Sequence, residues 1–232
     1  YPISFLIKLI NFLNTKKNKT KVKIKTICVG NIYIGGTGKT SLSIKINELL
    51  KRKNIRSCFI KKFYTRQLDE QKLLESKGKL FLSKKRLNAI LQAQNENYEV
   101  AILDDGLQDH SINYDLRFVC FNNINWKGNG MTIPSGPLRE EFINIKKYEN
   151  IFLNGNLENL DLLKKEILGV NPNINIHIGK YEASNIEEFK KNENYLVFSG
   201  IGNHNTFLSM LKNYGLNIIK DIEFSDHHNY TN

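Results

Sequence analysis

The chain has 232 residues, of which 41% are hydrophobic and 25% charged, a composition typical of a globular protein rather than a disordered or collagen-like one. Lysine and arginine total 34 against 23 acids, so the net charge of +11 favours anionic partners such as nucleic acid, acidic lipid headgroups or phosphorylated small molecules. No run approaches the ~20 apolar residues that a membrane-spanning helix needs.

The N-terminal segment, residues 3–13, is mostly apolar, and its polar positions Ser4, Lys8 and Asn11 fall on one narrow stripe of a helix. Six lysines follow between residues 16 and 25. Two interpretations are open. The helix lies in an anionic membrane surface, or it packs on its own domain.

The next elements alternate between strands and helices. We expect a strand at 22–29, a helix from residue 40, a strand at 57–60, a helix at 84–97, a strand ending at two acids, 104–105, and strands at 116–121 and 150–154. Such alternation predicts an α/β fold with a mostly parallel sheet flanked by helices, as in P-loop NTPases.

The composition changes after about residue 155, where asparagine and lysine become dense and two shorter strands are expected at 174–179 and 195–200. We therefore predict a larger domain at 1–155 and a second, smaller α/β domain at 156–232. Cys28, Cys58 and Cys120 are far apart and each lies in an apolar run, so buried free thiols are expected rather than disulfides or metal ligands.

The strongest local signal is the stretch GGTGKT between the first strand and the first long helix, formed by Gly35, Gly36, Thr37, Gly38, Lys39 and Thr40. Glycines let backbone N–H groups curl round a phosphate, and the following helix points its positive end at the same anion. In that case Lys39 reaches the β- and γ-phosphates, and the Thr40 hydroxyl binds Mg²⁺. The strict P-loop pattern has glycine where Tyr33 stands. The alternative is a glycine-rich turn with an exposed lysine.

The second half of a nucleotide site is an acid at the end of a neighbouring buried strand. Asp104 and Asp105 end such a strand and are followed by Gly106. A carboxylate there holds Mg²⁺ directly or through water. Solvated turn residues are the alternative. Together with the glycine-rich loop, these acids predict a site for a nucleoside triphosphate with magnesium, without naming the acceptor.

Five segments resemble, in this order, the tetraacyldisaccharide 4'-kinase family: VGNIYIGGTGKTS, LDDGLQ, GNGMTIPSGPLRE, FSGIGN and FSDHHNY. Generic P-loop proteins lack the GPLRE segment. The resemblance implies ATP-dependent phosphorylation of the 4'-hydroxyl of a tetraacylated disaccharide 1-phosphate in lipid A biosynthesis, with ATP and Mg²⁺ as cofactors. It also implies a peripheral location on the cytoplasmic face of the bacterial inner membrane, with the N-terminal helix docked on its anionic surface.

The resemblance also assigns catalytic residues. Asp69 matches the family's catalytic aspartate, which accepts the proton of the attacking hydroxyl. The family pairs this acid with a histidine of a DHH-like segment, here His227 or His228, and the choice between them is open. Arg139 of GPLRE is expected at ATP or at the phosphate that the substrate already carries. Taken alone, these residues fit a solvated helix-start acid, loop histidines and a structural arginine equally well.

The chain departs from the family pattern beside Asp69, where Leu68 and Gln71 replace glycine and proline. It ends at Asn232, where the family continues, so we expect an incomplete second domain. Two other classes of function stay open: a P-loop NTPase that binds nucleic acid, and a non-catalytic nucleotide-binding remnant. The first predicts aromatic residues interleaved with basic ones on one face, which the sequence lacks, so no nucleic-acid partner is expected. The sequence leaves the oligomeric state open.

Overall fold

The computed structural model describes residues 20, 22–64, 67–155, 158–225 and 228. Its larger part is a seven-stranded sheet with the strand order β3-β2-β4-β1-β5-β6-β7, and every pair of neighbouring strands is parallel. The strands are β1 (Lys25–Gly30), β2 (Ser57–Lys62), β3 (Leu80–Ser83), β4 (Val100–Asp104), β5 (Leu116–Asn122), β6 (Asn150–Asn154) and β7 (Asn175–Ile178).

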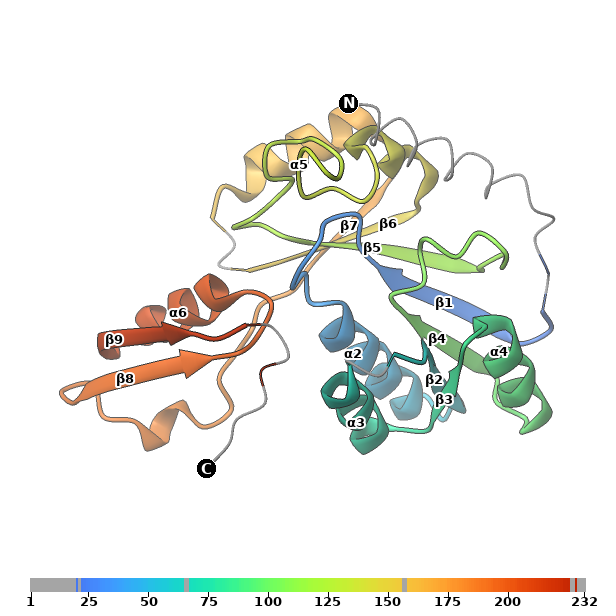
Figure 1. The fold of residues 1–232 in the computed structure, drawn as a ribbon, viewed down its shortest axis with the longest axis horizontal. Helices are drawn as coiled ribbons and strands as arrows, with labels where there is room; N and C mark the ends of the chain where they lie inside the picture. Colours follow the sequence, from blue (N-terminus) through green and yellow to red (C-terminus); the bar gives the residue numbers. More distant parts are fainter. Residues whose placement is uncertain (1–19, 21, 65–66, 156–157, 226–227, 229–232) are drawn as a thin grey trace.

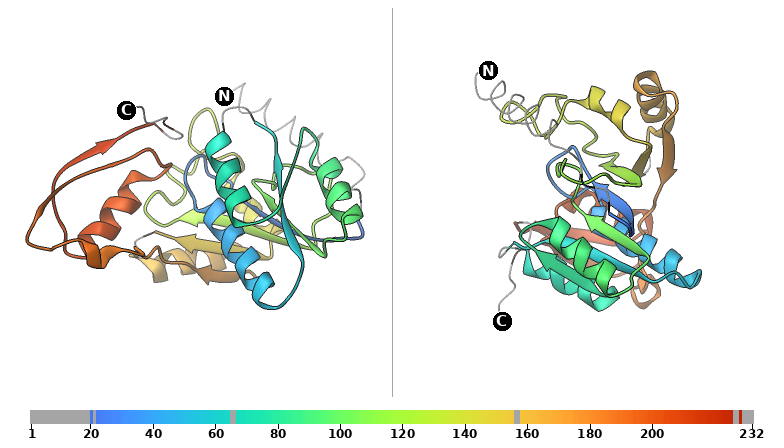
Figure 2. Two further views of the ribbon diagram at one scale, coloured as in Figure 1. Left: turned by 90° about the horizontal axis from the view of Figure 1, so that it is seen from below. Right: turned by 90° about the vertical axis from the view of Figure 1, so that its right-hand side faces the viewer.

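Helices cover both faces of this sheet, so the fold has three layers, which can be followed in Figure 1 and from two further sides in Figure 2. One face carries α2 (Lys39–Arg52) and α3 (Leu68–Lys77). The other carries α4 (Arg86–Asn95), the 3₁₀ helix η1 (Phe142–Lys147) and α5 (Leu160–Val170).

Alternate side chains of a strand point to opposite faces of a sheet, and β2 shows what this does here. Cys58 and Ile60 pack with α4, whereas Phe59 packs with α2 and α3. Because both faces are covered, β2 is buried over most of its length. Lys61 follows on the same side as Phe59, so its charged side chain enters the layer between the sheet and α3.

The centre of the sheet fixes where a ligand can bind. β1 lies between β4 and β5. After β1 the chain passes through α2 to β2, which lies beyond β4, whereas after β4 the chain passes β1 to reach β5 on the opposite side. In open α/β sheets such a reversal of strand order leaves a crevice at the carboxyl ends of the strands. The glycine-rich loop, residues 35–40, follows β1 directly and therefore occupies this crevice.

The smaller unit is a single β-α-β element made of β8 (Asn194–Ser199), α6 (His204–Asn213) and β9 (Asn217–Glu223), with parallel strands. A segment containing the short 3₁₀ helix η2 (Ile186–Glu188) connects it to the large sheet. The unit lies beside the sheet in Figure 1 and contacts the glycine-rich loop, because Gly36 N–H donates to the Gly202 carbonyl at 3.2 Å.

The fold confirms the predicted α/β class and its mostly parallel sheet. The expected strands at 22–29, 57–60, 116–121 and 150–154, and the expected helix at 84–97, match described elements within a few residues. All three cysteines are buried and free, as predicted. The N-terminal segment at 3–13 lies outside the described residues. Within the described part of the chain, no helix has the length and apolar character to cross a bilayer.

The placement of the strand at 174–179 in the smaller unit was wrong. β7 pairs with β6, in a register that sets Leu153 opposite Ile178, and extends the large sheet past the predicted boundary at residue 155. β7 joins the large sheet because the helix before it, α5, packs on that sheet. Leu163 and Ile167 of α5 are buried in the core beside Ile151. With its apolar side facing the sheet, α5 makes an ordinary crossover from β6 to β7. The assignment of the two units to separate domains stays a prediction.

Candidate active site

The glycine-rich loop has a conformation that depends on its glycines. Gly35 has φ 112° and Gly38 has φ 77°, values that side chains with a Cβ adopt only with strain. Gly36 lies so close to the smaller unit that a Cβ there would be 2.6 Å from the backbone carbon of Gly202. The loop is therefore shaped by its own sequence and by contact with the FSGIGN segment.

Two asparagines hold the loop in this shape. The Asn31 side-chain amide donates to the Gly35 carbonyl at 3.3 Å and to the Thr37 hydroxyl at 3.0 Å. The Asn154 amide, at the end of β6, donates to the Thr37 carbonyl at 2.8 Å. Sequence reasoning missed both residues, although their position at the carboxyl ends of buried strands was a usable signal.

The GPLRE segment supports the first half of the loop. Tyr33, which stands in place of the usual glycine, forms an antiparallel bridge with Leu138. Next to it, Ile34 N–H donates to the Pro137 carbonyl at 2.8 Å. Backbone pairing thus fixes a position where other P-loops use a glycine, and this explains why the departure from the strict pattern leaves the phosphate-facing part intact.

Asp104 is fully buried at the end of β4 and faces the start of α2. Its carboxylate accepts from the Thr40 hydroxyl at 3.5 Å and from the Ser43 hydroxyl at 3.4 Å. Mg²⁺ prefers oxygen ligands and is usually held by one or two protein groups together with substrate phosphates. Thr40 and Asp104 fit that requirement. No cluster of three or more His, Cys, Asp or Glu side chains suited to a metal occurs among the described residues.

Asp105 has different partners and faces another cavity. Its carboxylate forms an ion pair with Arg139 at 3.0 Å. Burial disfavours the charge of Asp105, but the cations Lys39, Arg139, Lys61 and Arg86 outweigh burial and hold its pKa below the usual value. Asp105 is therefore a fixed anion at the edge of the loop, and Arg139, predicted at a phosphate, is oriented by it.

A polar pocket of about 410 Å³ opens next to this ion pair, on the β4 side of the loop. Its lining includes Lys62, Arg86, Asp105, Gln108 and Arg139. Arg86 is nearly buried, and its Nε atom has no hydrogen-bond partner among the described residues. Asp109 also lines this pocket and pairs with Arg86 at 3.5 Å, so its three cations exceed its two carboxylates by one charge, and this surplus suits a polar, negatively charged ligand.

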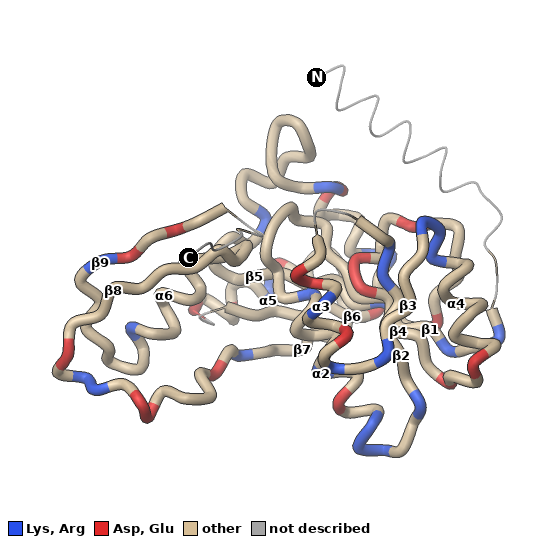
Figure 3. The backbone as a smooth tube through the Cα atoms, turned by 60° about the horizontal axis from the view of Figure 1, so that its bottom comes forward, with Lys and Arg blue, Asp and Glu red and all other residues tan. Residues whose placement is uncertain are grey.

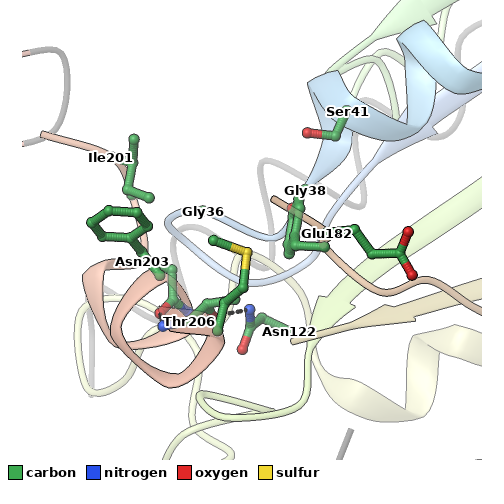
Figure 4. A pocket seen from close by; sticks show the side chains of 12 residues that line it. Gly36, Gly38, Ser41, Asn122, Glu182, Ile201, Asn203 and Thr206 are labelled. Carbon is green, nitrogen blue, oxygen red and sulfur yellow. Dashed lines mark hydrogen bonds between the residues drawn. The ribbon is translucent and has the colours of Figure 1, made fainter. Parts of the chain in front are cut away.

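A less polar cleft of about 340 Å³ lies on the β5 side of the loop, between the loop and the smaller unit. Figure 4 shows Gly36 and Gly38 on one wall and Asn203 and Thr206, at the start of α6, on the other. Ile201, Phe207 and Met210 contribute apolar surface. At the base of the cleft, the Asn122 amide of β5 donates to the Thr206 hydroxyl at 2.7 Å.

Asp69 is exposed in the first turn of α3. Its neighbour Glu70 forms an ion pair with Lys61 at 2.5 Å, and Lys61 also binds Asp104 at 2.6 Å. These two ion pairs connect the first turn of α3 to Asp104 of the candidate metal site. Sequence reasoning missed Lys61, because a lysine at the end of an apolar strand gives no sign of whether it is buried, and it considered Glu70 only as a substitute base for Asp69.

The predicted histidines are only partly described. His228 stacks on Phe224 with ring centroids 4.5 Å apart, and the backbone N–H of His228 donates to the Ser225 carbonyl. Asp226 and His227 lie outside the described residues. The pairing of either histidine with Asp69 stays a prediction.

Comparison with known proteins identifies relatives over the whole chain. The family model described as tetraacyldisaccharide-1-P 4'-kinase matches residues 1–79 and 68–232. A tetraacyldisaccharide 4'-kinase of Pelagibacter ubique is 60% identical over 230 residues, covering 99% of this chain and 73% of that protein. One from Rickettsia bellii is 31% identical, covering 99% and 75%. The crystal structure of LpxK from Aquifex aeolicus in complex with ATP has a TM-score of 0.68 and 25% identity, covering 98% of this chain and 81% of that one.

Proposed function

Because the chain belongs to the tetraacyldisaccharide 4'-kinase family, we propose that it transfers the γ-phosphoryl group of ATP to the 4'-hydroxyl of a tetraacylated disaccharide 1-phosphate in lipid A biosynthesis. The observation that carries this proposal is that the glycine-rich loop lines one cleft, while a second, polar pocket opens at Asp105, beside the acid that ends β4. A kinase has to hold two ligands with one phosphoryl group between them, and a simple NTPase needs only one such cavity.

The two cavities suit different ligands. The cleft on the β5 side combines apolar side chains with Asn122 and Asn203, and this mixture suits the adenine and ribose of ATP. The polar pocket on the β4 side suits the sugar and its phosphate, since Lys62, Arg86 and Arg139 line it. Lys39 is the first residue of α2, directly after the loop glycines, where the phosphates of ATP would bind.

The chemistry follows from this arrangement. The 4'-hydroxyl oxygen attacks the γ-phosphorus, its proton passes to Asp69, and the bond from the γ-phosphorus to the β–γ bridging oxygen breaks to release ADP. The Lys39 ammonium stabilises the charge on the transferred group. Thr40 and Asp104 would hold Mg²⁺ together with the nucleotide, and the bound ion would neutralise further phosphate charge. Asp105 orients Arg139 toward the acceptor pocket.

The direct test is phosphate transfer from labelled ATP to the purified disaccharide lipid in mixed micelles. Transfer that depends on the lipid and on Mg²⁺ is expected. ATP hydrolysis that DNA or RNA stimulates, without transfer to the lipid, would contradict the proposal and favour the nucleic-acid-binding class. ATP binding with neither reaction would identify a non-catalytic remnant.

The strand-end acids are expected to affect different ligands. Asp104→Asn should raise the Mg²⁺ concentration for half-maximal rate by about tenfold, because it removes charge beside Thr40. Asp105→Asn should leave that concentration unchanged and raise the KM of the lipid by about tenfold, because Arg139 loses its partner. Titrations of Mg²⁺ and of lipid for both variants check this. If Asp105→Asn raises the Mg²⁺ concentration for half-maximal rate more than Asp104→Asn does, the roles assigned to the two acids have to be exchanged.

We also propose that the protein works as a peripheral protein at the cytoplasmic face of the inner membrane. A lipid substrate leaves the bilayer only at about 0.8 kcal/mol for each exposed CH₂, so the kinase has to reach the surface. The apolar segment at 3–13 and the lysines that follow it have the composition of an interfacial anchor.

Deleting residues 1–17 should release the protein from anionic vesicles, and salt should weaken binding of the intact chain, since attraction between lysines and headgroups is screened over ~10 Å at 0.1 M salt. Sedimentation with vesicles checks this, with zwitterionic vesicles as the control. Equal sedimentation of the truncated and intact chains would favour a segment packed on its own domain.

A further inference from the structure

Lys61 is a buried cation that the chemistry outlined above does not use. It lies near the end of β2, and its side chain is 3% exposed. A buried ammonium is costly unless it is paired and hydrogen-bonded. Here it contacts the Asp104 carboxylate at 2.6 Å and the Glu70 carboxylate at 2.5 Å, so two anions from different elements share one cation.

The two carboxylates favour the charged form of Lys61. Burial alone would lower the pKa of Lys61, but Asp104 and Glu70 outweigh it and raise the pKa above its usual value. Figure 3 shows basic and acidic segments meeting where β2, β4 and α3 come together. Lys61 is therefore enclosed by two carboxylates, and it links the end of β4 to the first turn of α3.

The Lys61–Glu70 ion pair ties the first turn of α3 to the sheet. Only Gln71 and Leu74 of this helix are buried, and its first turn has no side-chain cap. Besides the Lys61–Glu70 ion pair, the Gln71 amide holds the turn by donating to the Tyr64 carbonyl at 2.8 Å. Asp69 lies in the same turn, so its position depends on how firmly this turn is held.

We propose that Lys61 is a positioning residue for phosphoryl transfer, which holds the first turn of α3, and with it Asp69, against the carboxyl end of β4 through Glu70. The inference rests on the proposed function, since it takes Asp69 as the base. The other carboxylate that Lys61 binds, Asp104, contacts Thr40 and Ser43 of α2. One lysine thus joins the helix that carries the base to the helix that begins at the phosphates.

A mutant cycle tests this link: Lys61→Met removes the cation, Glu70→Gln removes only the α3 side of the cluster, and the double variant removes both. Each single variant should lower kcat by about tenfold with less than a twofold change in the Kd of ATP, and the double variant should be no slower than Lys61→Met. Lys61→Arg should retain most of the rate. Lys72→Met, an exposed change on the same helix, is the matched control.

Hydrogen exchange supplies a readout that does not need activity. Peptides from α3 should exchange about tenfold faster in Lys61→Met and Glu70→Gln than in the wild type, while peptides from the glycine-rich loop stay unchanged in Glu70→Gln. If Lys61→Met fails to fold, Glu70→Gln carries the test, because it keeps the Lys61–Asp104 pair.

Three outcomes would overturn the inference. The first is a wild-type kcat in folded Glu70→Gln. The second is a set of independent, multiplicative losses in the double variant. The third is a loss of ATP affinity as large as the loss of kcat, which would make Lys61 a support for the phosphate loop. A failure of the proposed function looks different, since the wild-type protein itself would then transfer no phosphate to the lipid.

Discussion

Lys39→Ala is expected to lower kcat for phosphate transfer by roughly 10³-fold while the protein stays folded. The Lys39 ammonium is the cation that follows the loop glycines directly, at the amino end of α2, where charge builds up on the transferred phosphoryl group. Removing one such preorganised donor from an active site typically costs 10²- to 10³-fold, and here the donor also carries a full charge.

The same change should leave stability almost unaltered. Lys39 is partly exposed, and alanine is the best helix former, so the free energy of unfolding should change by no more than about 0.5 kcal/mol. Turnover and thermal melting are measured together, with Lys45→Ala as the control on an exposed position of α2. Near wild-type turnover in folded Lys39→Ala would remove the P-loop assignment.

The sequence predicted the parts of the site that are local in the chain. The glycine-rich loop is one continuous segment, and its φ values at Gly35 and Gly38 are those that only glycine adopts without strain. Asp104 ends a strand whose other residues are all apolar, and Asp105 comes directly after it, so their place at the carboxyl edge of the sheet follows from the strand itself.

The supports of the site could not be predicted in the same way, because they join distant segments. Asn154 reaches the carbonyl of Thr37 across 117 residues, and Gly202 packs against Gly36 from the smaller unit. The place of Asn154 at the end of a buried strand makes it a candidate, but the local sequence shows the partner of neither Asn154 nor Gly202. Knowledge of the strand order was needed first, since β6 and β1 are separated only by β5.

The difference between the two acids has the same origin. Adjacent residues at the end of a strand point in different directions, so Asp104 faces α2 whereas Asp105 faces Arg139. The sequence shows the pair but not which element covers each face. The wrong placement of β7 arose similarly, because a short strand with exposed positions resembles an edge strand of either sheet.

Asp69→Asn is expected to lower kcat by on the order of 10² or more, because an amide cannot accept the proton of the attacking hydroxyl. Substrate binding should change little, since in the proposed arrangement the glycine-rich loop and the cleft beside it hold ATP, and Asp69 contacts only the acceptor oxygen. The measurement is kcat together with the Kd of ATP. Glu75→Gln, which removes the same charge from an exposed position of α3, is the control and should behave as wild type.

The histidines complete this prediction. If a histidine orients Asp69, then His227→Ala or His228→Ala should lower kcat alone but add little in combination with Asp69→Asn, because an orienting partner has no further effect once the base is gone. Multiplicative losses of kcat in the double variants would mean that the histidines act independently of Asp69. An unimpaired Asp69→Asn enzyme would transfer the role of the base to Glu70, the neighbouring carboxylate in the same helical turn.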